Sequence, residues 1–225
     1  MTRTNRVSPD GSLAAHPAQG AFMGNRGCLH DEAGVIRRAF VGKAWITCTL
    51  NLRPGGTPRP HDQPGRYTPL FFTDEAVACA AGHRPCFECR RAVAKDFAAA
   101  WTRAFGTAAR AREMDAVLHS ARWDGASRQR LRPLGTVDDA PDGVFFLWNG
   151  TPHLVWQGSA RPWSFEGYGS ARPLPEGQHP VLTPEPLVKV MRAGWRPVLS
   201  RDEDRPSWQP GAARPGNLDP WALLR

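Results

Sequence analysis

The chain has 225 residues, of which 41% are hydrophobic, and this is enough to bury one good-sized core or two small ones. Trp, Phe, Leu and Val are plentiful, which excludes a chain that is disordered throughout. No apolar run approaches the roughly 18 residues that a membrane-spanning helix needs. The N-terminal residues also lack the apolar centre of a signal peptide. We therefore expect a soluble, cytoplasmic protein with no membrane partner.

The formal net charge of +8 fits a polyanionic partner such as DNA. Only Lys43, Lys95 and Lys189 are lysines, and all other basic residues except histidine are arginines. Arginine suits bidentate contacts with phosphate. The same excess of Arg, together with many Ala, Gly and Pro residues, is also typical of a GC-rich genome. The charge by itself leaves both interpretations open.

With 22 Gly and 22 Pro, the chain favours turns and short elements, and we predict an α+β fold. Residues 1–20 are predicted to be a flexible arm, and the globular part begins near Met23. The stretch AWITCTL at 44–50 has the residue types of a strand. The Pro- and Gly-rich run at 53–68 predicts a loop.

Three helices are predicted to follow this loop. The first spans 73–82, with an N-cap residue and two carboxylates at its start and Gly82 after its end. The second runs from Pro85, which suits a first helical position, to Phe105, with apolar residues every four positions. The third is expected over 113–122.

The second half of the chain predicts strands and one helix. Strand-like runs at 144–148 and 151–156 flank Asn149-Gly150, the turn pair that favours a hairpin. A helix is expected from Thr183 to Gly194. The predicted organisation of the chain has five parts: a flexible arm (1–20), a module with helices (21–123), a polar linker (124–142), a β-rich region with one helix (143–200) and a disordered tail (201–225).

The cysteines carry the clearest chemical signal, because all of them lie in the first 89 residues: Cys28, Cys48, Cys79, Cys86 and Cys89. In a reducing compartment such a cluster favours a metal over disulfides. Zinc needs about four ligands in a tetrahedron, and a Cys-x-x-Cys pair supplies two from one turn of backbone. At the start of a helix, free N–H groups and the helix dipole also favour thiolates. We predict a Zn²⁺ ion held by Cys28, Cys48, Cys86 and Cys89.

The fourth ligand has alternatives. His30, close to Cys28, or Cys79 in the first predicted helix could replace Cys28. A small core residue is the simpler interpretation of Cys79. A redox-active pair is the competing interpretation of Cys86 and Cys89, but the βαβ pattern of a thioredoxin-like motif is not found.

The run LFFTDEAVACAAGHRPCFECRR at 70–91 resembles the zinc-binding module of the Ada family of bacterial DNA methylation-repair proteins. The resemblance extends over about residues 41–95, under a third of the chain. It implies a four-cysteine zinc site in which one cysteine accepts a methyl group from a DNA phosphotriester. By position, Cys48 matches the acceptor, and Cys86 and Cys89 match two further ligands.

The chain departs from this family at one ligand. The family's second cysteine comes four residues after the first, and that place holds Leu52 here, so a different fourth ligand is implied, with Cys28 as the first choice. The whole chain also resembles another bacterial protein family, which has a GNRG-x-LHD start like the run GNRGCLHD at 24–31, and this second likeness implies no activity.

Three kinds of function follow from these observations. The first is a zinc-stabilised protein that binds DNA through phosphate contacts near the metal, from Arg84, Arg90 and Arg91. The second is a sacrificial methyl acceptor that uses Cys48. The third is an enzyme with its site in the second half, where the candidate residues are His119, Asp138, Asp139, His153, Glu166 and Tyr168. No Gly-rich phosphate loop, nucleophile elbow or metal-hydrolase signature accompanies them.

The metal site, the basic run and the aromatic residues also have purely structural interpretations. Zinc could simply stabilise a small core, and the protein could then bind another protein. The basic run at 122–132 is expected to be a solvated linker, and the aromatic residues at 162–169 are expected to pack in the core or in a hairpin.

Overall fold

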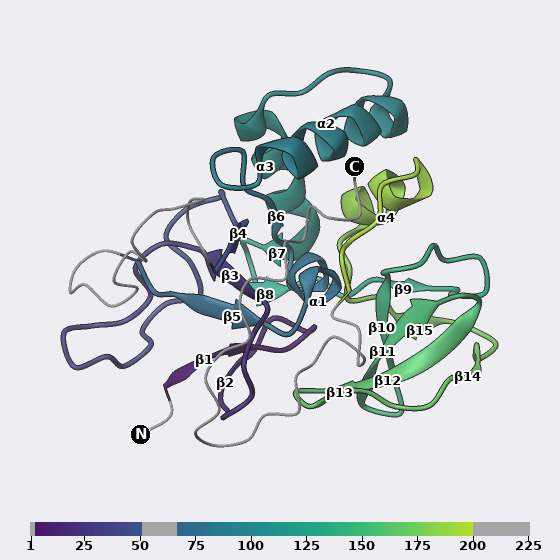
Figure 1. The fold of residues 1–225 in the computed structure, drawn as a ribbon, viewed down its shortest axis with the longest axis horizontal. Helices are drawn as coiled ribbons and strands as arrows, with labels where there is room; N and C mark the ends of the chain where they lie inside the picture. Colours follow the sequence, from purple (N-terminus) through teal and green to yellow (C-terminus); the bar gives the residue numbers. More distant parts are fainter. Residues whose placement is uncertain (1–2, 51–66, 200–225) are drawn as a thin grey trace, which may run out of the picture.

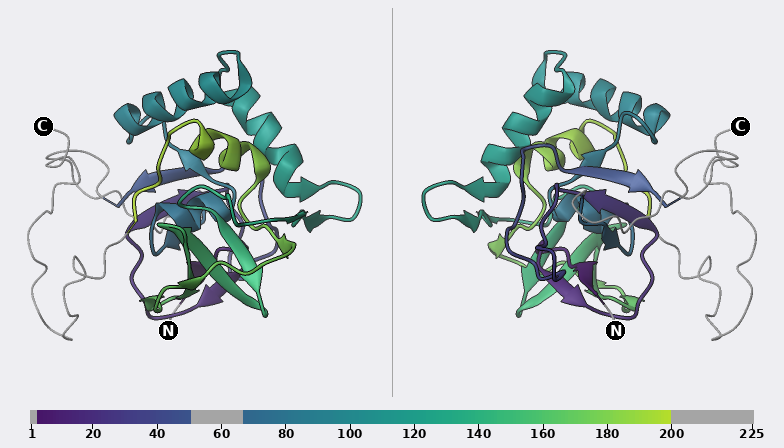
Figure 2. Two further views of the ribbon diagram at one scale, coloured as in Figure 1. Left: turned by 90° about the vertical axis from the view of Figure 1, so that its right-hand side faces the viewer. Right: turned by 90° about the vertical axis from the view of Figure 1, so that its left-hand side faces the viewer.

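The computed structural model of the protein describes residues 3–50 and 67–199. These residues form the predicted mixture of helices and strands (Figure 1). The helices α2, α3 and α4 lie together on one side of the molecule, and most of the strands lie below them (Figure 2). Within the described residues, no helix is both long and apolar enough to cross a membrane.

The N-terminal sheet has six short strands in the spatial order β2-β1-β5-β3-β4-β6. The pairs β1–β5 and β4–β6 are parallel, and the other neighbours are antiparallel. The parallel pair β4–β6, at one edge of the sheet, therefore joins segments that are far apart in the chain. The strands are β1 (Thr4–Val7), β2 (Leu13–Ala15), β3 (Phe22–Asn25), β4 (Ile46–Thr49), β5 (Leu70–Phe72) and β6 (Arg84–Pro85).

Residues 4–15 form two strands of this sheet, so the prediction of a flexible arm was wrong. Val7 is fully buried, and Arg6 of β1 pairs with Phe71 of β5. The strands are short, and their apolar residues are too few to make a period-2 pattern in the sequence. Their backbone is ordered by pairing with a strand that comes much later in the chain.

Three of the four helices within the described residues agree with the sequence. α1 (Glu75–Ala80) has Asp74 as its N-cap, and the Asp74 carboxylate accepts a hydrogen bond from the Val77 N–H at 2.9 Å. Gly82 follows the helix with a φ of 88°, a left-handed conformation that suits glycine. The other two are α3 (Ala111–Arg122) and α4 (Glu185–Arg192).

The helix α2 (Arg91–Phe105) starts later than predicted. Arg84 and Pro85 pair with β4 as strand β6, and this pairing replaces the first turn that the proline suggested. The Cys-x-x-Cys motif therefore lies in the turn before the helix. Of the predicted apolar face, Phe97 and Trp101 are buried and Val93 is partly buried, whereas Cys89 precedes the helix.

The predicted hairpin in the second half is confirmed. β10 (Phe145–Trp148) and β11 (Thr151–Trp156) pair antiparallel, and Asn149 and Gly150 between them have φ values of 50° and 75°. The same sheet continues with β12 (Ser159–Ser164), β13 (Gly167–Tyr168) and β14 (Arg172–Pro173). Two small pairs complete the strands: β7 (Trp123–Asp124) with β8 (Gln129–Arg130), and β9 (Leu134–Gly135) with β15 (His179–Pro180).

The second sheet is buried on both faces, and this joins the two halves of the chain. Phe146 and Val155 share a core cluster with residues of α2, α3 and α4. Phe145 and Leu154, on the opposite face, share a second cluster with residues of α1 and the N-terminal sheet. A separate N-terminal zinc module over 21–123 is therefore not confirmed.

The segment 124–142 is not a polar linker. It contains β8 and β9, and Val137 within it is 1% exposed. Most of its residues are polar, but a few apolar residues among them pack into the core. The predicted tail at 201–225 and most of the predicted loop at 53–68 lie outside the described residues.

The basic run after α3 is partly internal. Arg122 is fully buried, and Arg122 and Arg130 both donate hydrogen bonds to carbonyl groups at the C-terminal end of α1, including that of Gly82. Both guanidinium groups also lie over the ring of Trp45, at 3.9 and 5.8 Å from its centroid. These two arginines therefore stabilise the fold, and the expectation of a solvated run was wrong for them.

Replacing Val7 by Ala tests the position of the N-terminal residues. Because Val7 is fully buried, we expect the free energy of unfolding in urea to fall by about 1–3 kcal/mol. Leu134 is 64% exposed and provides the control. Leu134→Ala should change the same quantity by no more than about 0.5 kcal/mol. Equal effects of the two substitutions would contradict the burial of Val7.

Candidate metal centre

Three cysteine sulfurs converge at one edge of the N-terminal sheet. Cys48 lies on β4, and Cys86 and Cys89 lie in the turn between β6 and α2. All three Sγ atoms are within 4.8 Å of one another. Zinc–sulfur bonds of about 2.3 Å in a tetrahedron place two sulfurs about 3.8 Å apart. The structure thus brings together three of the four predicted ligands at a spacing that suits one metal ion.

Backbone hydrogen bonds produce this convergence. In the parallel pairing of β4 with β6, Thr47 lies opposite Pro85, and the Cys86 N–H donates to the Thr47 carbonyl at 3.0 Å. The Arg90 N–H donates to the Cys86 carbonyl at 3.1 Å and closes the turn. The turn also supplies one donor to sulfur, because the Glu88 N–H lies 3.4 Å from the Cys86 Sγ. A donor of this kind stabilises a thiolate.

The centre is largely shielded from solvent. Cys48 and Cys86 are each 7% exposed, whereas Cys89 is partly exposed. Met23 of β3 lies opposite Cys48 on the neighbouring strand and packs against the cysteines. An apolar surrounding limits solvent access to a bound ion. The other apolar neighbours are Ile46, Leu50, Tyr67 and Phe71.

Three thiols this close together cannot all ionise unless a cation is present. Hydrogen bonding with the Cys86 and Cys89 sulfurs, followed by burial, raises the pKa of Cys48 far above its usual value. Hydrogen bonds from Cys48 and Cys89 lower the pKa of Cys86 to about 2. For Cys89, contact with Cys48 lowers the pKa, but contact with Cys86 and burial outweigh it and raise the pKa. A bound cation would stabilise all three thiolates and release the remaining protons.

Cys28, the predicted fourth ligand, is not part of this group. β3 and β4 are antiparallel, with Met23 opposite Cys48 and Asn25 opposite Ile46, so the chain beyond Asn25 runs away from Cys48. The Cys28 thiol donates to the His30 carbonyl at 3.6 Å. Sequence proximity to the globular region suggested Cys28, but the strand direction places it at the wrong end.

The two alternative fourth ligands also lie elsewhere. The His30 ring is hydrogen-bonded to the Thr68 hydroxyl at 2.6 Å. Cys79 is fully buried in the core cluster that contains Phe97, which agrees with the interpretation as a core residue. Among residues 3–50 and 67–199, no fourth Cys, His, Asp or Glu joins the three cysteines. Leu52 lies outside the described residues.

Two of the three arginines predicted to contact DNA are buried in ion pairs. Arg84 donates two hydrogen bonds of 2.8 Å to Asp115 of α3. Arg90 pairs with Glu75 of α1. Because these guanidinium groups are buried and compensated, they are not available to phosphate, and that part of the prediction is contradicted. Arg91 is the one of the three that is exposed.

These ion pairs hold the Cys-x-x-Cys turn from both sides. Arg84 precedes Cys86 and is anchored to α3, while Arg90 follows Cys89 and is anchored to α1. The second carboxylate oxygen of Glu75 accepts a hydrogen bond from the Val198 N–H at 2.9 Å. The position of the two sulfurs is thus set by contacts with distant elements.

The candidate residues of the second half do not form a common site. The carboxylate of Asp139 pairs with Arg192 at 3.0 Å, and that of Glu166 pairs with His16 at 3.1 Å. His153 is buried beside aromatic rings, His119 packs against Phe40, and Asp138 is exposed. Their separate partners give no support to a catalytic group there.

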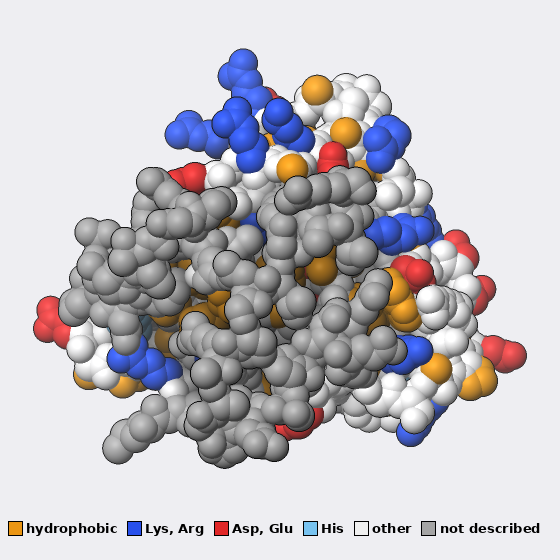
Figure 3. Space-filling model, in the orientation of Figure 1, with side chains coloured by type: hydrophobic (Ala, Val, Ile, Leu, Met, Phe, Trp, Pro, Cys, Tyr) orange, Lys and Arg blue, Asp and Glu red, His pale blue; other side chains and the backbone are white. Residues whose placement is uncertain are grey.

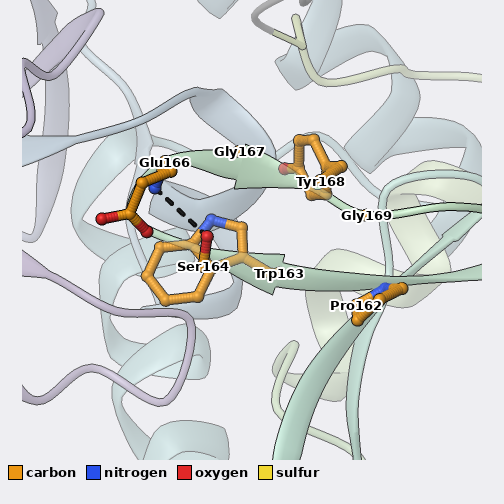
Figure 4. A pocket seen from close by; sticks show the side chains of 7 residues that line it. All are labelled: Pro162, Trp163, Ser164, Glu166, Gly167, Tyr168 and Gly169. Atoms are coloured by element: carbon orange, nitrogen blue, oxygen red, sulfur yellow. Dashed lines mark hydrogen bonds between the residues drawn. The ribbon is translucent and has the colours of Figure 1, made fainter.

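A shallow pocket of about 410 Å³ lies on the β12–β13 hairpin (Figure 4). A hydrogen bond from the Glu166 N–H to Ser164 closes the turn at its edge. The Trp163 indole N–H donates to Thr73 at 3.2 Å, and the Tyr168 hydroxyl donates to Asp74 at 2.5 Å. These aromatic side chains are engaged in packing, as expected. The lining residues are Pro162, Trp163, Ser164, Glu166, Gly167, Tyr168 and Gly169.

Breaking the Arg84–Asp115 pair tests its structural role. In Asp115→Asn the buried guanidinium loses its counter-charge, and we expect the free energy of unfolding to fall by about 3–5 kcal/mol. Asp138→Asn, on the exposed surface, is the control and should have little effect. Replacing both partners, as Arg84→Met with Asp115→Leu, should recover much of the loss, because no unpaired charge remains. A stability of Asp115→Asn equal to wild type would show that the pair is unimportant.

Comparisons with protein-family models, curated proteins and solved structures give no match for this chain. The resemblance to the Ada zinc-binding module therefore remains a prediction from the sequence. The convergence of Cys48, Cys86 and Cys89 is the observation on which a function can be built.

Proposed function

We propose that Cys48, Cys86 and Cys89 bind one Zn²⁺ ion. The observation that carries this proposal is the approach of three sulfurs, from two distant segments, to within 4.8 Å of one another. Thiolate ligands select zinc, copper(I) or iron–sulfur clusters. Among these, the resemblance to the Ada module supports zinc.

The zinc ion would serve mainly as a cross-link. It would join β4 to the turn before α2, and so add to the two-residue strand β6 and to the two ion pairs that hold this turn. Metal binding contributes free energy to folding when the site forms only in the folded chain. When bound, the metal supplies charge neutralisation for three thiolates.

We propose duplex DNA as the partner of this protein. The net charge of +8 supports a polyanion, and the exposed Arg91 lies close in the chain to Cys89. Arg84 and Arg90 do not support it, because both are buried in ion pairs.

A methyl-acceptor role for Cys48 has less support. A nucleophile must be reached by its substrate, and Cys48 is 7% exposed and covered by Met23. Incubation with DNA that carries methyl phosphotriesters, followed by mass spectrometry of the protein, tests this role. We expect an unchanged mass. A methyl group located on Cys48 would establish the acceptor function.

Elemental analysis of cysteine variants tests the zinc site. We expect the wild-type protein to contain one zinc ion per chain, and Cys48→Ser, Cys86→Ser and Cys89→Ser each to lose most of it, because each removes a thiolate ligand. Cys28→Ser and Cys79→Ala are matched controls and should keep full zinc. Zinc retained in Cys86→Ser would contradict the proposal, and zinc lost from Cys28→Ser would restore Cys28 as a ligand.

A further inference from the structure

Exposed basic side chains gather on the helical layer. We define the α2–α3 basic surface by five of them, all exposed: Arg91, Lys95, Arg103, Arg110 and Arg112. Figure 3 shows Lys and Arg side chains concentrated over the part of the molecule formed by these helices. The exposed acidic residues of the same stretch are only Asp96 and Glu113. The balance of charge on this surface is therefore strongly positive.

The helix geometry directs Arg91 and Lys95 to solvent, whereas the Arg103 guanidinium donates a hydrogen bond to the Ala193 carbonyl at 2.9 Å. Arg91 and Lys95 are one turn apart on α2, so they share a face, with their Cα atoms about 6 Å apart along the axis. Phe97 and Trp101 occupy the buried face of the same helix. Small exposed residues lie beside the basic ones and leave room for a close approach: Ala92, Ala99 and Thr102.

The positive charge of this surface is not neutralised internally. Within the described residues, no ion pair joins any of the five basic groups to a carboxylate. Glu113 is engaged with the backbone, because its carboxylate accepts a hydrogen bond from the Arg110 N–H at 2.6 Å. The neighbouring helix α4 differs, since Lys189 pairs with Glu185 at 2.8 Å and Arg192 pairs with Asp139 at 3.0 Å.

We propose that the α2–α3 basic surface binds the phosphate backbone of duplex DNA. This inference rests on the DNA partner proposed above and replaces the contacts first assigned to Arg84 and Arg90. Binding of single strands relies on exposed aromatic rings that stack with bases. The exposed residues of α2 and α3 include no aromatic side chain, so a duplex is the better fit. Contacts to phosphates position a protein on DNA without reading its sequence.

The metal centre contributes to this surface through the backbone. α2 begins directly after Cys89 and Arg90, so the zinc-held turn and the Arg90–Glu75 pair set the direction in which Arg91 and Lys95 project. A rigid presentation lowers the entropy lost on binding.

The test is the salt dependence of binding by the zinc-loaded full chain to a fluorescent duplex of arbitrary sequence. Each neutralised phosphate adds about −0.9 to the slope of log K against log salt concentration. Arg91→Gln with Lys95→Gln should therefore reduce the magnitude of the slope by about 2. The matched control is Lys189→Gln with Arg192→Gln, which removes the same charge from α4 and should leave the slope almost unchanged.

The outcomes separate this inference from the functions on which it rests. An equal reduction in both double variants would overturn the assignment to α2 and α3 while leaving DNA as a partner. No binding by the wild-type protein at low salt, or binding that salt does not weaken, would overturn the DNA partner and this surface together. Zinc content, measured on the same samples, reports the metal site independently. Tighter binding to a single strand than to its duplex would overturn the choice of duplex DNA.

Discussion

A buried ion pair between Arg90 and Glu75 connects the cysteine turn to the centre of the molecule. Glu75 belongs to a run of three polar residues at the start of α1, and each bonds to a different distant element. Thr73 accepts from Trp163, Asp74 accepts from Tyr168, and Glu75 accepts from Arg90 and from the backbone N–H of Val198. The start of this short helix is therefore bonded to the turn of the metal centre, to the second sheet and to the segment around Val198 that follows α4.

Buried charge of this kind constrains the structure more than it stabilises it. Removing an ion pair from water costs several kcal/mol per ion, and the interaction repays this only when the geometry is good. Loss of one partner leaves an uncompensated charge in the core. The pairs Arg84–Asp115 and Arg90–Glu75 thus favour one arrangement of the Cys-x-x-Cys turn over others. A zinc ion would bind to sulfurs whose positions are already set by these contacts, which reduces the cost of ordering the site.

Two groups of arginines within residues 3–50 and 67–199 have different roles. Arg84, Arg90 and Arg122 are buried and compensate carboxylates or helix-end carbonyls. The groups on α2 and at the start of α3 are exposed and contribute positive charge at the surface. Net charge in the sequence counts both groups equally, although only the second can meet a phosphate. This explains why the metal-flanking arginines were the wrong choice as DNA contacts.

Elements that depend on near neighbours in the chain were predictable from the sequence. The Asn149-Gly150 hairpin, the helices α1, α3 and α4, and the buried face of α2 follow from turn residues, caps and hydrophobic period, which act over a few residues. The Cys-x-x-Cys pair was evident for the same reason. The clustering of the cysteines and the resemblance to a known module both pointed to Cys48 as a further ligand, and the structure places its sulfur beside that pair.

The sequence by itself determined which chemical groups and which fold class are present: a thiol-rich first third, an α+β composition and an excess of positive charge. Only the tertiary structure decided which of these groups meet. Strand pairing carried Cys48 to Cys86 and led Cys28 away, ordered residues 4–15, and buried Val137 of the supposed linker. Partners such as Asp115 for Arg84 are separated by many residues. Contacts of that range depend on the topology of the whole chain, and no local pattern in the sequence encodes them.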